Sequence, residues 1–94
     1  MWEVLEARKV HKQLKKCPQE IKMEYEAWKM VVQLTGPSAL RKILGYHDHA
    51  LKGQWLGARS SYLNIQWRVI YVVLKESIQV RVLEVIAHDY RKKG

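Results

Sequence analysis

The sequence predicts an α+β domain in which a helical hairpin packs on one face of a small, twisted antiparallel sheet. Two observations predict this fold. Residues 7–34 carry apolar side chains at helical spacing, and residues 61–86 are rich in β-branched and aromatic residues interrupted only by short polar turns. The expected order is strand, helix, helix, strand, strand, strand. A chain of 94 residues has room for one such domain, so we expect residues 1–94 to form a single unit.

The first strand and the helical hairpin occupy the N-terminal third. Apolar and polar residues alternate briefly over 2–6, which predicts a short strand. From Ala7 the apolar spacing changes to three and four, with lysines and arginine between, which predicts an amphipathic helix with a basic outer face that ends near Cys17. Pro18 suits the first turn of a second helix. Its apolar stripe comprises Ile21, Tyr25, Trp28 and Val32, and the Gly-Pro pair at 36–37 ends it.

The second half of the chain predicts a loop followed by three strands. A short helical turn is expected over 38–44, and residues 45–57, which contain three glycines and no steady period, form the main loop. The runs at 61–65, 67–75 and 78–86 are apolar and β-branched, which predicts three antiparallel strands.

The register of the last hairpin decides which way two strand arginines face. A two-residue turn at Glu76-Ser77 would pair Leu74 with Gln79 and put Arg68 and Arg81 on one face. The opposite, core face would then receive Val69, Tyr71, Val73, Val80, Val82 and Ile86. A three-residue turn would separate the two arginines, because a slip of one residue exchanges the faces. We favour the first register, since it leaves both guanidinium groups on the solvent side.

Composition indicates an anionic partner inside a cell. The net charge is +8 and the pI about 9.8, and the positive charge is spread along the chain rather than confined to a tail. No apolar stretch is long enough to cross a bilayer, and the N-terminus lacks the layout of a signal peptide. Cys17 is the only cysteine, so no internal disulfide can form. We therefore expect a cytoplasmic protein without a membrane partner.

The run His88-Asp89-Tyr90 directly follows the last predicted strand. A histidine can take the proton from a ribose 2′-hydroxyl or return one to the leaving 5′-oxygen, while arginines stabilise the charge that gathers on the phosphate. This is the chemistry of a metal-free ribonuclease. The alternative is that His88 is a surface or capping residue.

The main loop contributes further candidates. Lys52 and Arg59 can hold phosphates, and Trp55 or Tyr62 can stack on a base, although both rings can equally pack inward. His47-Asp48-His49 offers zinc ligands, but it has no second ligand pair, so we expect no metal. The glycines of this loop lack the spacing of a phosphate-cradling motif, so we expect no nucleotide cofactor.

Four segments together resemble one family. They are residues 48–53 (DHALKG), 57–60 (GARS), 67–71 (WRVIY) and 84–90 (EVIAHDY). In order and spacing they are similar to the RelE/ParE superfamily of toxins from bacterial type II toxin–antitoxin systems, and within it to the RelE branch with its YafQ and HigB types. The resemblance spans nearly the whole chain and implies a β-α-α-β-β-β domain.

The resemblance also implies a function. It suggests an endoribonuclease that cuts mRNA in the ribosomal A site, beside 16S rRNA, and that a cognate antitoxin protein neutralises. Matching positions suggest His88 as general acid or base with Tyr90 beside it, and His49 as a further participant. The matching phosphate-binding or stabilising residues are Lys52, Arg59 and Arg68, with Arg81 matching loosely.

The chain departs from the YafQ pattern at two positions. Tyr62 stands where those toxins have a histidine, and Gln66 where they have an aspartate. The second proton-transfer group is therefore open between Tyr90, His49 and a lysine.

Two other functions fit the same scaffold. One is a ParE-like toxin that inhibits DNA gyrase by binding, and the other is a non-catalytic RNA-binding module. The terminal His-Asp-Tyr run favours the ribonuclease, because ParE-type chains generally lack it.

Overall fold

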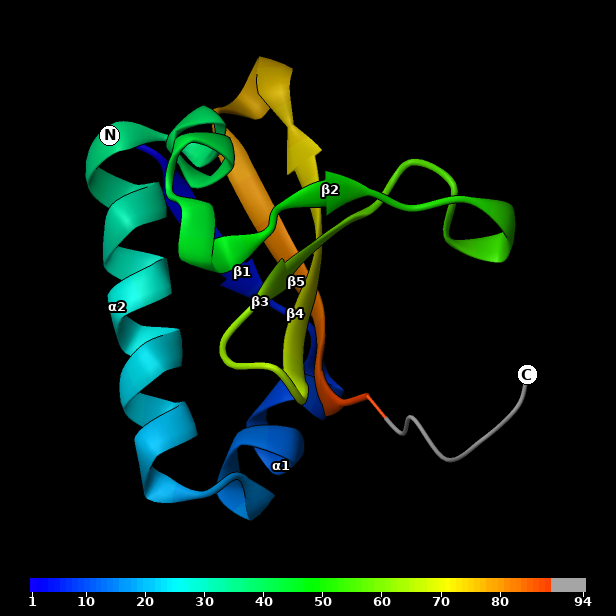
Figure 1. Ribbon diagram of the computed structural model, residues 1–94. Coiled ribbons are helices and arrows are strands. Elements are labelled where there is room, and N and C mark those ends of the chain that lie inside the picture. Colours follow the sequence, from blue (N-terminus) through cyan, green and yellow to red (C-terminus); the bar gives the residue numbers. More distant parts are fainter. Residues whose placement is uncertain (89–94) are drawn as a thin grey trace.

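The computed structural model describes residues 1–88 of the chain. Strand β1 (Glu3–Glu6) leads into helices α1 (Arg8–Lys16) and α2 (Gln19–Thr35), which short 3-10 turns follow. The remaining strands are β2 (His49–Ala50), β3 (Arg59–Tyr62), β4 (Trp67–Leu74) and β5 (Gln79–Ala87). They form one sheet in the order β1-β5-β4-β3-β2, with the helical pair on one side of it (Figure 1). The α+β class and the helical hairpin are confirmed.

The sheet is mixed rather than wholly antiparallel, so that part of the prediction was wrong. β1 lies parallel to β5, with Glu3 beside Gln79 and Glu6 beside Val82. Parallel strands need a long crossover, which the helices and the rest of the sheet supply between β1 and β5. The short N-terminal strand therefore forms one edge of the sheet.

The boundaries of the next two strands also differ from the prediction. β2 lies inside the predicted loop and pairs with β3, with His49 opposite Ser60 and Ala50 opposite Arg59. β3 ends at Tyr62, whereas a strand over 61–65 was expected. The cause is Asn64, whose side-chain oxygen accepts hydrogen bonds from the backbone N–H groups of residues 66 and 67 and so closes a turn there.

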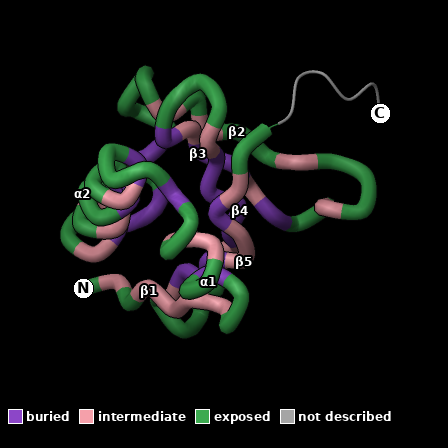
Figure 2. The backbone as a smooth tube through the Cα atoms, turned by 90° about the horizontal axis from the view of Figure 1, so that it is seen from below, coloured by how far each residue is buried: buried purple, intermediate pink, exposed green. Residues whose placement is uncertain are grey.

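The core lies between α2 and the sheet (Figure 2). All four residues of the predicted helical stripe are at most 1% exposed, which confirms the periodicity argument. Trp28 stacks on Tyr25 with ring centroids 5.9 Å apart and meets Tyr71 edge-on at 5.3 Å. The helix-facing side of the sheet supplies Val69, Val80, Val82 and Val85. The helical pair packs against this face, and the opposite face of the sheet is left open (Figure 1).

The last hairpin has the favoured register at its turn but not along its whole length. Leu74 pairs with Gln79, and the N–H of Ile78 donates to the carbonyl of Lys75 at 3.1 Å. Arg81 lies opposite Val72 and shares a face with Arg68, as expected. Further along, Tyr71 pairs with Val82 but Ile70 pairs with Glu84, which leaves one extra residue in β5. This β-bulge exchanges the two faces beyond it.

The bulge corrects one member of the predicted core. Val85 is 1% exposed and packs in the core, whereas Ile86, which was expected there, lies on the opposite face. The sequence pattern of β5 contains no break at this point, so strict alternation assigned Ile86 to the core in place of Val85.

Glu6 ties the first strand to α2. Its carboxylate accepts hydrogen bonds from the Tyr25 hydroxyl at 2.6 Å and from Lys29 Nζ at 3.2 Å. Burial by itself would raise the pKa of Glu6, but these two hydrogen bonds and the positive charge of Lys29 outweigh burial, and the pKa of Glu6 is lowered. Within residues 1–88, none of the helices combines the length and apolar character that a membrane span requires.

Candidate active site

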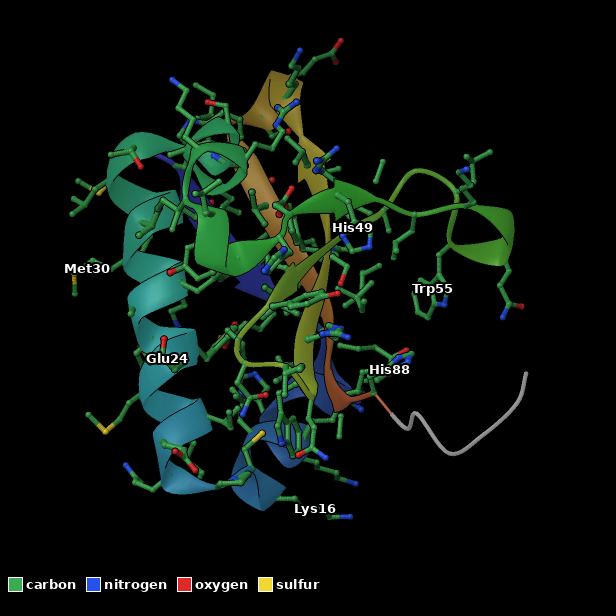
Figure 3. All side chains as sticks on the ribbon, viewed as in Figure 1. Lys16, Glu24, Met30, His49, Trp55 and His88 are labelled. Atoms are coloured by element: carbon green, nitrogen blue, oxygen red, sulfur yellow. The ribbon has the colours of Figure 1, made fainter. Side chains whose placement is uncertain are left out.

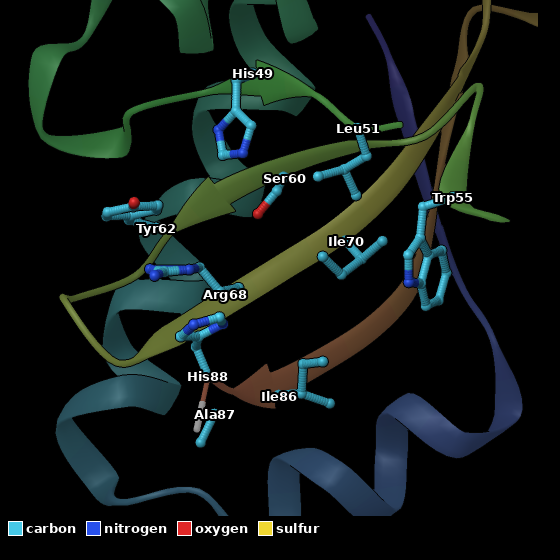
Figure 4. Close-up of a pocket in the computed structure, with 10 residues that line it drawn as sticks. All are labelled: His49, Leu51, Trp55, Ser60, Tyr62, Arg68, Ile70, Ile86, Ala87 and His88. Carbon is cyan, nitrogen blue, oxygen red and sulfur yellow. The ribbon is translucent and has the colours of Figure 1, made fainter. Parts of the chain in front are cut away.

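A pocket of about 480 Å³ lies on the open face of the sheet (Figure 4). It draws on β2, β3, β4, the end of β5 and the loop after β2. Figure 3 shows that His49, Trp55 and His88 all lie on the side of the sheet away from α2. The lining residues are His49, Leu51, Trp55, Ser60, Tyr62, Arg68, Ile70, Ile86, Ala87 and His88.

Strand pairing brings these side chains together. Residues directly opposite each other on neighbouring strands project to the same face of a sheet. One row across the strands is Tyr62, Arg68 and Ile86, and the next is His49, Ser60 and Ile70. Each row therefore delivers two side chains with polar or charged groups and one aliphatic side chain to the pocket.

Arg68 is held over an aromatic ring. Its guanidinium carbon lies 3.5 Å from the centroid of the Tyr62 ring, and its Nη1 donates to the carbonyl of Ile65 at 3.2 Å. The residue is only 8% exposed. Cation–π stacking and a backbone acceptor together fix the plane of the guanidinium group. The pocket thus contains a permanent positive charge in a defined orientation.

His49 has a defined tautomer. Its Nδ1 lies 2.8 Å from the carbonyl oxygen of His47. A carbonyl can only accept a hydrogen bond, so Nδ1 carries the proton in the neutral ring and Nε2 carries the lone pair. The ring also meets Tyr62 edge-on at 6.4 Å. His49 can therefore accept a proton at Nε2.

His88 follows β5 at the other end of the pocket. Its backbone N–H donates to the carbonyl of Gln66 at 2.5 Å, which holds the residue beside the start of β4. The imidazole lines the pocket and lies next to Arg68 in Figure 4. An imidazole on each side of the guanidinium group can serve acid and base roles in the same reaction.

Asp48 and Arg59 belong to the helix-facing side of the sheet. The Asp48 side chain is fully buried and accepts hydrogen bonds from Arg59 Nε at 2.7 Å, from Ser61 Oγ at 2.5 Å and from the Tyr71 hydroxyl. Desolvation would lower the pKa of Arg59, but its hydrogen bond to Asp48 raises it. Burial, reinforced by the bond to Asp48, raises the pKa of Tyr71. These groups form a closed structural cluster.

The positions of the predicted site residues divide accordingly. His49, Tyr62, Arg68 and His88 converge on the pocket. Arg59, expected to hold phosphate, is paired with Asp48 and lines a separate hollow of about 380 Å³ on the helix side. Lys52 and Arg81 are exposed and are not among the lining residues. Tyr90 lies outside the described residues.

The sequence motifs did not show which of these residues would lie in the pocket and which would lie on the helix-facing side. The Asp48 carboxylate of the His47-Asp48-His49 run is taken up by Arg59, Ser61 and Tyr71. Across residues 1–88, no three His, Cys, Asp or Glu side chains gather in an arrangement that would hold a metal. Sequence reasoning missed Ser60, Ile70 and Ile86 as lining residues. Alternation along β4 could have identified Ile70, because it lies between the core residues Val69 and Tyr71.

Comparisons with known proteins identify the fold. No protein-family model and no curated protein sequence match the chain. Among solved structures, it is similar to an archaeal RelE–RelB complex from Pyrococcus horikoshii OT3, with a TM-score of 0.76 and 18% identity over 95% of this chain and 97% of that one. It is similar to a variant of YafQ from E. coli, with a TM-score of 0.73 and 16% identity over 93% of each chain.

A third solved structure is the YoeB–YefM toxin–antitoxin complex from Staphylococcus aureus, with a TM-score of 0.72 and 15% identity over 95% of this chain and 99% of that one. The three likenesses cover almost the whole of each chain at low identity. What they establish is the backbone arrangement, not the identity of the site residues. The chain therefore has the RelE-like fold that these RelE, YafQ and YoeB structures share.

Proposed function

We propose that the chain is the toxin of a type II toxin–antitoxin system and that it cleaves mRNA in the ribosomal A site. One observation carries this proposal. Arg68, His49 and His88, which the resemblance implied as site residues, line a single pocket on the open face of the sheet. A fixed cation between two imidazoles suits the cleavage of a phosphodiester, in which negative charge gathers on the phosphate while two protons move.

The proposed reaction is an attack by the ribose 2′-oxygen on the adjacent phosphorus. One imidazole takes the proton of the 2′-hydroxyl while the 2′-oxygen bonds to phosphorus. The bond from phosphorus to the 5′-oxygen then breaks, and the second imidazole donates a proton to that oxygen. The products are a 2′,3′-cyclic phosphate and a free 5′-hydroxyl. His49, with its lone pair on Nε2, fits the base, and His88 fits the acid.

Arg68 is proposed to stabilise the charge that builds on the non-bridging phosphate oxygens. A guanidinium group already fixed over Tyr62 loses little orientational freedom when the phosphate arrives. This assignment makes His49 the second proton-transfer group that the sequence left open.

The partners follow from charge and from the related structures. The outward side chains of α1 include five exposed cations, Arg8, Lys9, Lys12, Lys15 and Lys16. With the +8 net charge, they suit contact with the phosphates of 16S rRNA in the cytoplasm. Solved relatives of this fold include complexes of RelE with RelB and of YoeB with YefM, and we propose a cognate antitoxin protein for this chain as well.

The test compares two pocket variants with a matched strand variant. Arg68→Ala and His88→Ala are expected to abolish growth arrest and to lower mRNA cleavage by about 10²-fold or more, as loss of a transition-state donor does. Arg81→Ala removes an arginine from the same sheet face outside the pocket and is expected to stay fully toxic. Cleavage is mapped by primer extension on cellular messages, where cuts in phase with codons indicate action on the ribosome.

Three results would contradict the proposal. Full toxicity of both pocket variants would remove the assigned site. Arrest with stalled replication and DNA damage but intact messages would instead indicate a gyrase inhibitor. Binding of RNA without any cleavage would indicate a non-catalytic module.

A further inference from the structure

The pocket has two chemically different halves (Figure 4). His49, Tyr62, Arg68 and His88 occupy one half and supply its charge and proton-transfer groups. The other half is formed by Leu51, Trp55, Ile70 and Ile86. A phosphate gains nothing from aliphatic and aromatic walls, so the charged half alone accounts for the scissile group. The apolar half is left without a role in the proposed reaction.

The apolar half is built on a shaped loop rather than on a loose one. The N–H of Leu51 donates to the carbonyl of Ala58 at 2.9 Å and closes the base of the loop. Inside it, the N–H of Ala58 donates to the carbonyl of Trp55 at 2.9 Å. Gly53 and Gly57 have φ angles of 66° and 97°, which glycine adopts without strain. The backbone of Trp55 is thus held by hydrogen bonds, and its indole stands at the pocket.

The neighbouring side chain shows that the orientation of Trp55 is specific. Leu56 is 81% exposed and is not among the lining residues, whereas Trp55 is partly buried against the pocket. Burial of apolar surface alone would favour turning either side chain inward. The loop turns the flat ring toward the pocket and leaves the aliphatic side chain outside.

A flat aromatic wall opposite aliphatic side chains suits one part of an RNA strand, the base. Stacking of an unpaired base on an aromatic ring contributes about 1–3 kcal/mol and tolerates any base. Leu51, Ile70 and Ile86 have no polar side-chain atoms, so these walls cannot read hydrogen-bond patterns. They can only favour the larger ring system, because a purine offers more surface to stack than a pyrimidine does.

We infer that the apolar half of the pocket binds the base next to the scissile phosphate, that Trp55 stacks on it, and that this contact favours cutting beside a purine. The inference rests on the proposed ribonuclease function and adds a specificity-determining residue to it. Trp55 carries out no proton transfer. It holds the base, and through the base it positions the phosphate against Arg68.

The first test uses three loop variants on ribosomes programmed with a defined message. Trp55→Ala is expected to lower kcat/KM about tenfold to hundredfold, which corresponds to the stacking energy. Trp55→Phe keeps a stacking ring and is expected to recover most of the rate. Leu56→Ala changes the adjacent exposed side chain and is expected to cleave like the original chain. Thermal melting of each variant confirms that the fold is intact.

The second test removes the base instead of the protein ring. A synthetic message carries one abasic nucleotide beside the cut, with all phosphates kept. The original chain is expected to cleave it about tenfold more slowly than the intact message, whereas Trp55→Ala should cleave both messages at nearly the same rate. Mapped cut sites should show a purine preference that Trp55→Ala loses and Trp55→Phe keeps.

The outcomes separate this inference from the proposed function. If the original chain cleaves messages but Trp55→Ala cuts at the same rate and beside the same bases, the ribonuclease stands and the stacking role is wrong. An equal penalty for the abasic nucleotide in both proteins has the same meaning. If the original chain cleaves no message at all, the proposed function fails, and the inference fails with it.

Discussion

The two faces of the sheet give neighbouring residues different surroundings. Asp48 and His49 are consecutive, yet the Asp48 carboxylate is buried among Arg59, Ser61 and Tyr71, while the His49 ring lines the open pocket. In the helix-facing cluster, the donors of Arg59, Ser61 and Tyr71 are matched to the fully buried Asp48 carboxylate. The pocket cluster holds imidazole and guanidinium groups around a space of about 480 Å³. Polar residues of the same types thus stabilise the fold on one face and are available for chemistry on the other.

This contrast predicts that substitutions on the helix-facing side mainly change the free energy of unfolding, whereas substitutions in the pocket mainly change the cleavage rate. A closed cluster contributes to the free energy of unfolding, because its groups lose their partners when one is removed. If the open cluster carries out the proposed cleavage, it should contribute to the reaction rate and little to stability. The following predictions test that division.

The largest effect is expected for His49→Ala. If His49 is the base, the cleavage rate falls by about 10²–10⁴-fold, which is the usual contribution of general acid–base catalysis. The free energy of unfolding should change by less than about 0.5 kcal/mol, because the residue is exposed. His11→Ala, which removes an exposed histidine from α1, is the control and should keep full activity. A stable fold with an unchanged rate would remove His49 from the site.

Asp48→Ala should show the reverse pattern. Arg59, Ser61 and Tyr71 lose a buried acceptor, so the free energy of unfolding falls by about 3 kcal/mol in urea titrations. Asp48→Asn keeps an oxygen acceptor and should lose less. The cleavage rate per folded molecule should change by less than about threefold, which lies within the effect of small shifts in geometry. A large rate loss with unchanged stability would place Asp48 in the chemistry instead.

Tyr62 tests whether the arginine needs its aromatic support. Tyr62→Phe keeps the ring under the guanidinium group, so the rate should stay within about twofold, whereas Tyr62→Ala should lower it about tenfold, in line with a cation–π contact of 1–2 kcal/mol. Steady-state cleavage kinetics measure both variants. Equal losses would point to the hydroxyl rather than the ring, since only Tyr62→Phe retains the stacking surface.

The smallest effect concerns Glu6, a second carboxylate on the helix-facing side. Its pKa is lowered in the folded chain, so its ion pair stabilises the fold above the unfolded pKa of about 4.3. That contribution disappears as the pH falls through the lower, folded value. Urea unfolding across acidic pH should therefore show a steeper loss of stability for the original chain than for Glu6→Gln. Identical slopes would mean that Glu6 contributes nothing to acid sensitivity.

Much of this arrangement could be predicted from local pattern. Helical spacing identified the buried stripe of α2, because burial of one face imposes the period of 3.6 residues directly on the sequence. The residues that meet in the pocket were proposed from residue type and family resemblance, and four of them do meet there. The residue types and their positions near the ends of predicted strands were sufficient for that prediction.

The features that could not be predicted depend on pairing between strands, which no single segment of the sequence shows. β2 is two residues long, and only its partner strand reveals it. The parallel edge formed by β1 depends on residues more than 70 positions away in the chain. Arg59 had the charge expected of a phosphate ligand, but its facing was set by the register between β2 and β3, which places it with Asp48. The residue type of Arg59 indicated which groups it could bind, but the register between β2 and β3 decided on which face of the sheet it lies.

The single extra residue in β5 has a consequence for the imidazole that follows this strand. With uninterrupted alternation from Val82, even-numbered positions would continue toward the helices, and His88 would point into the protein. The added residue reverses that parity, and His88 joins Arg68 instead. The side of the sheet on which His88 lies is thus set by the number of residues in β5 rather than by the choice of any side chain. Deleting one residue between positions 82 and 86 is therefore expected to turn His88 away from Arg68 and so to abolish the proposed cleavage, although every proposed site residue would remain in the chain.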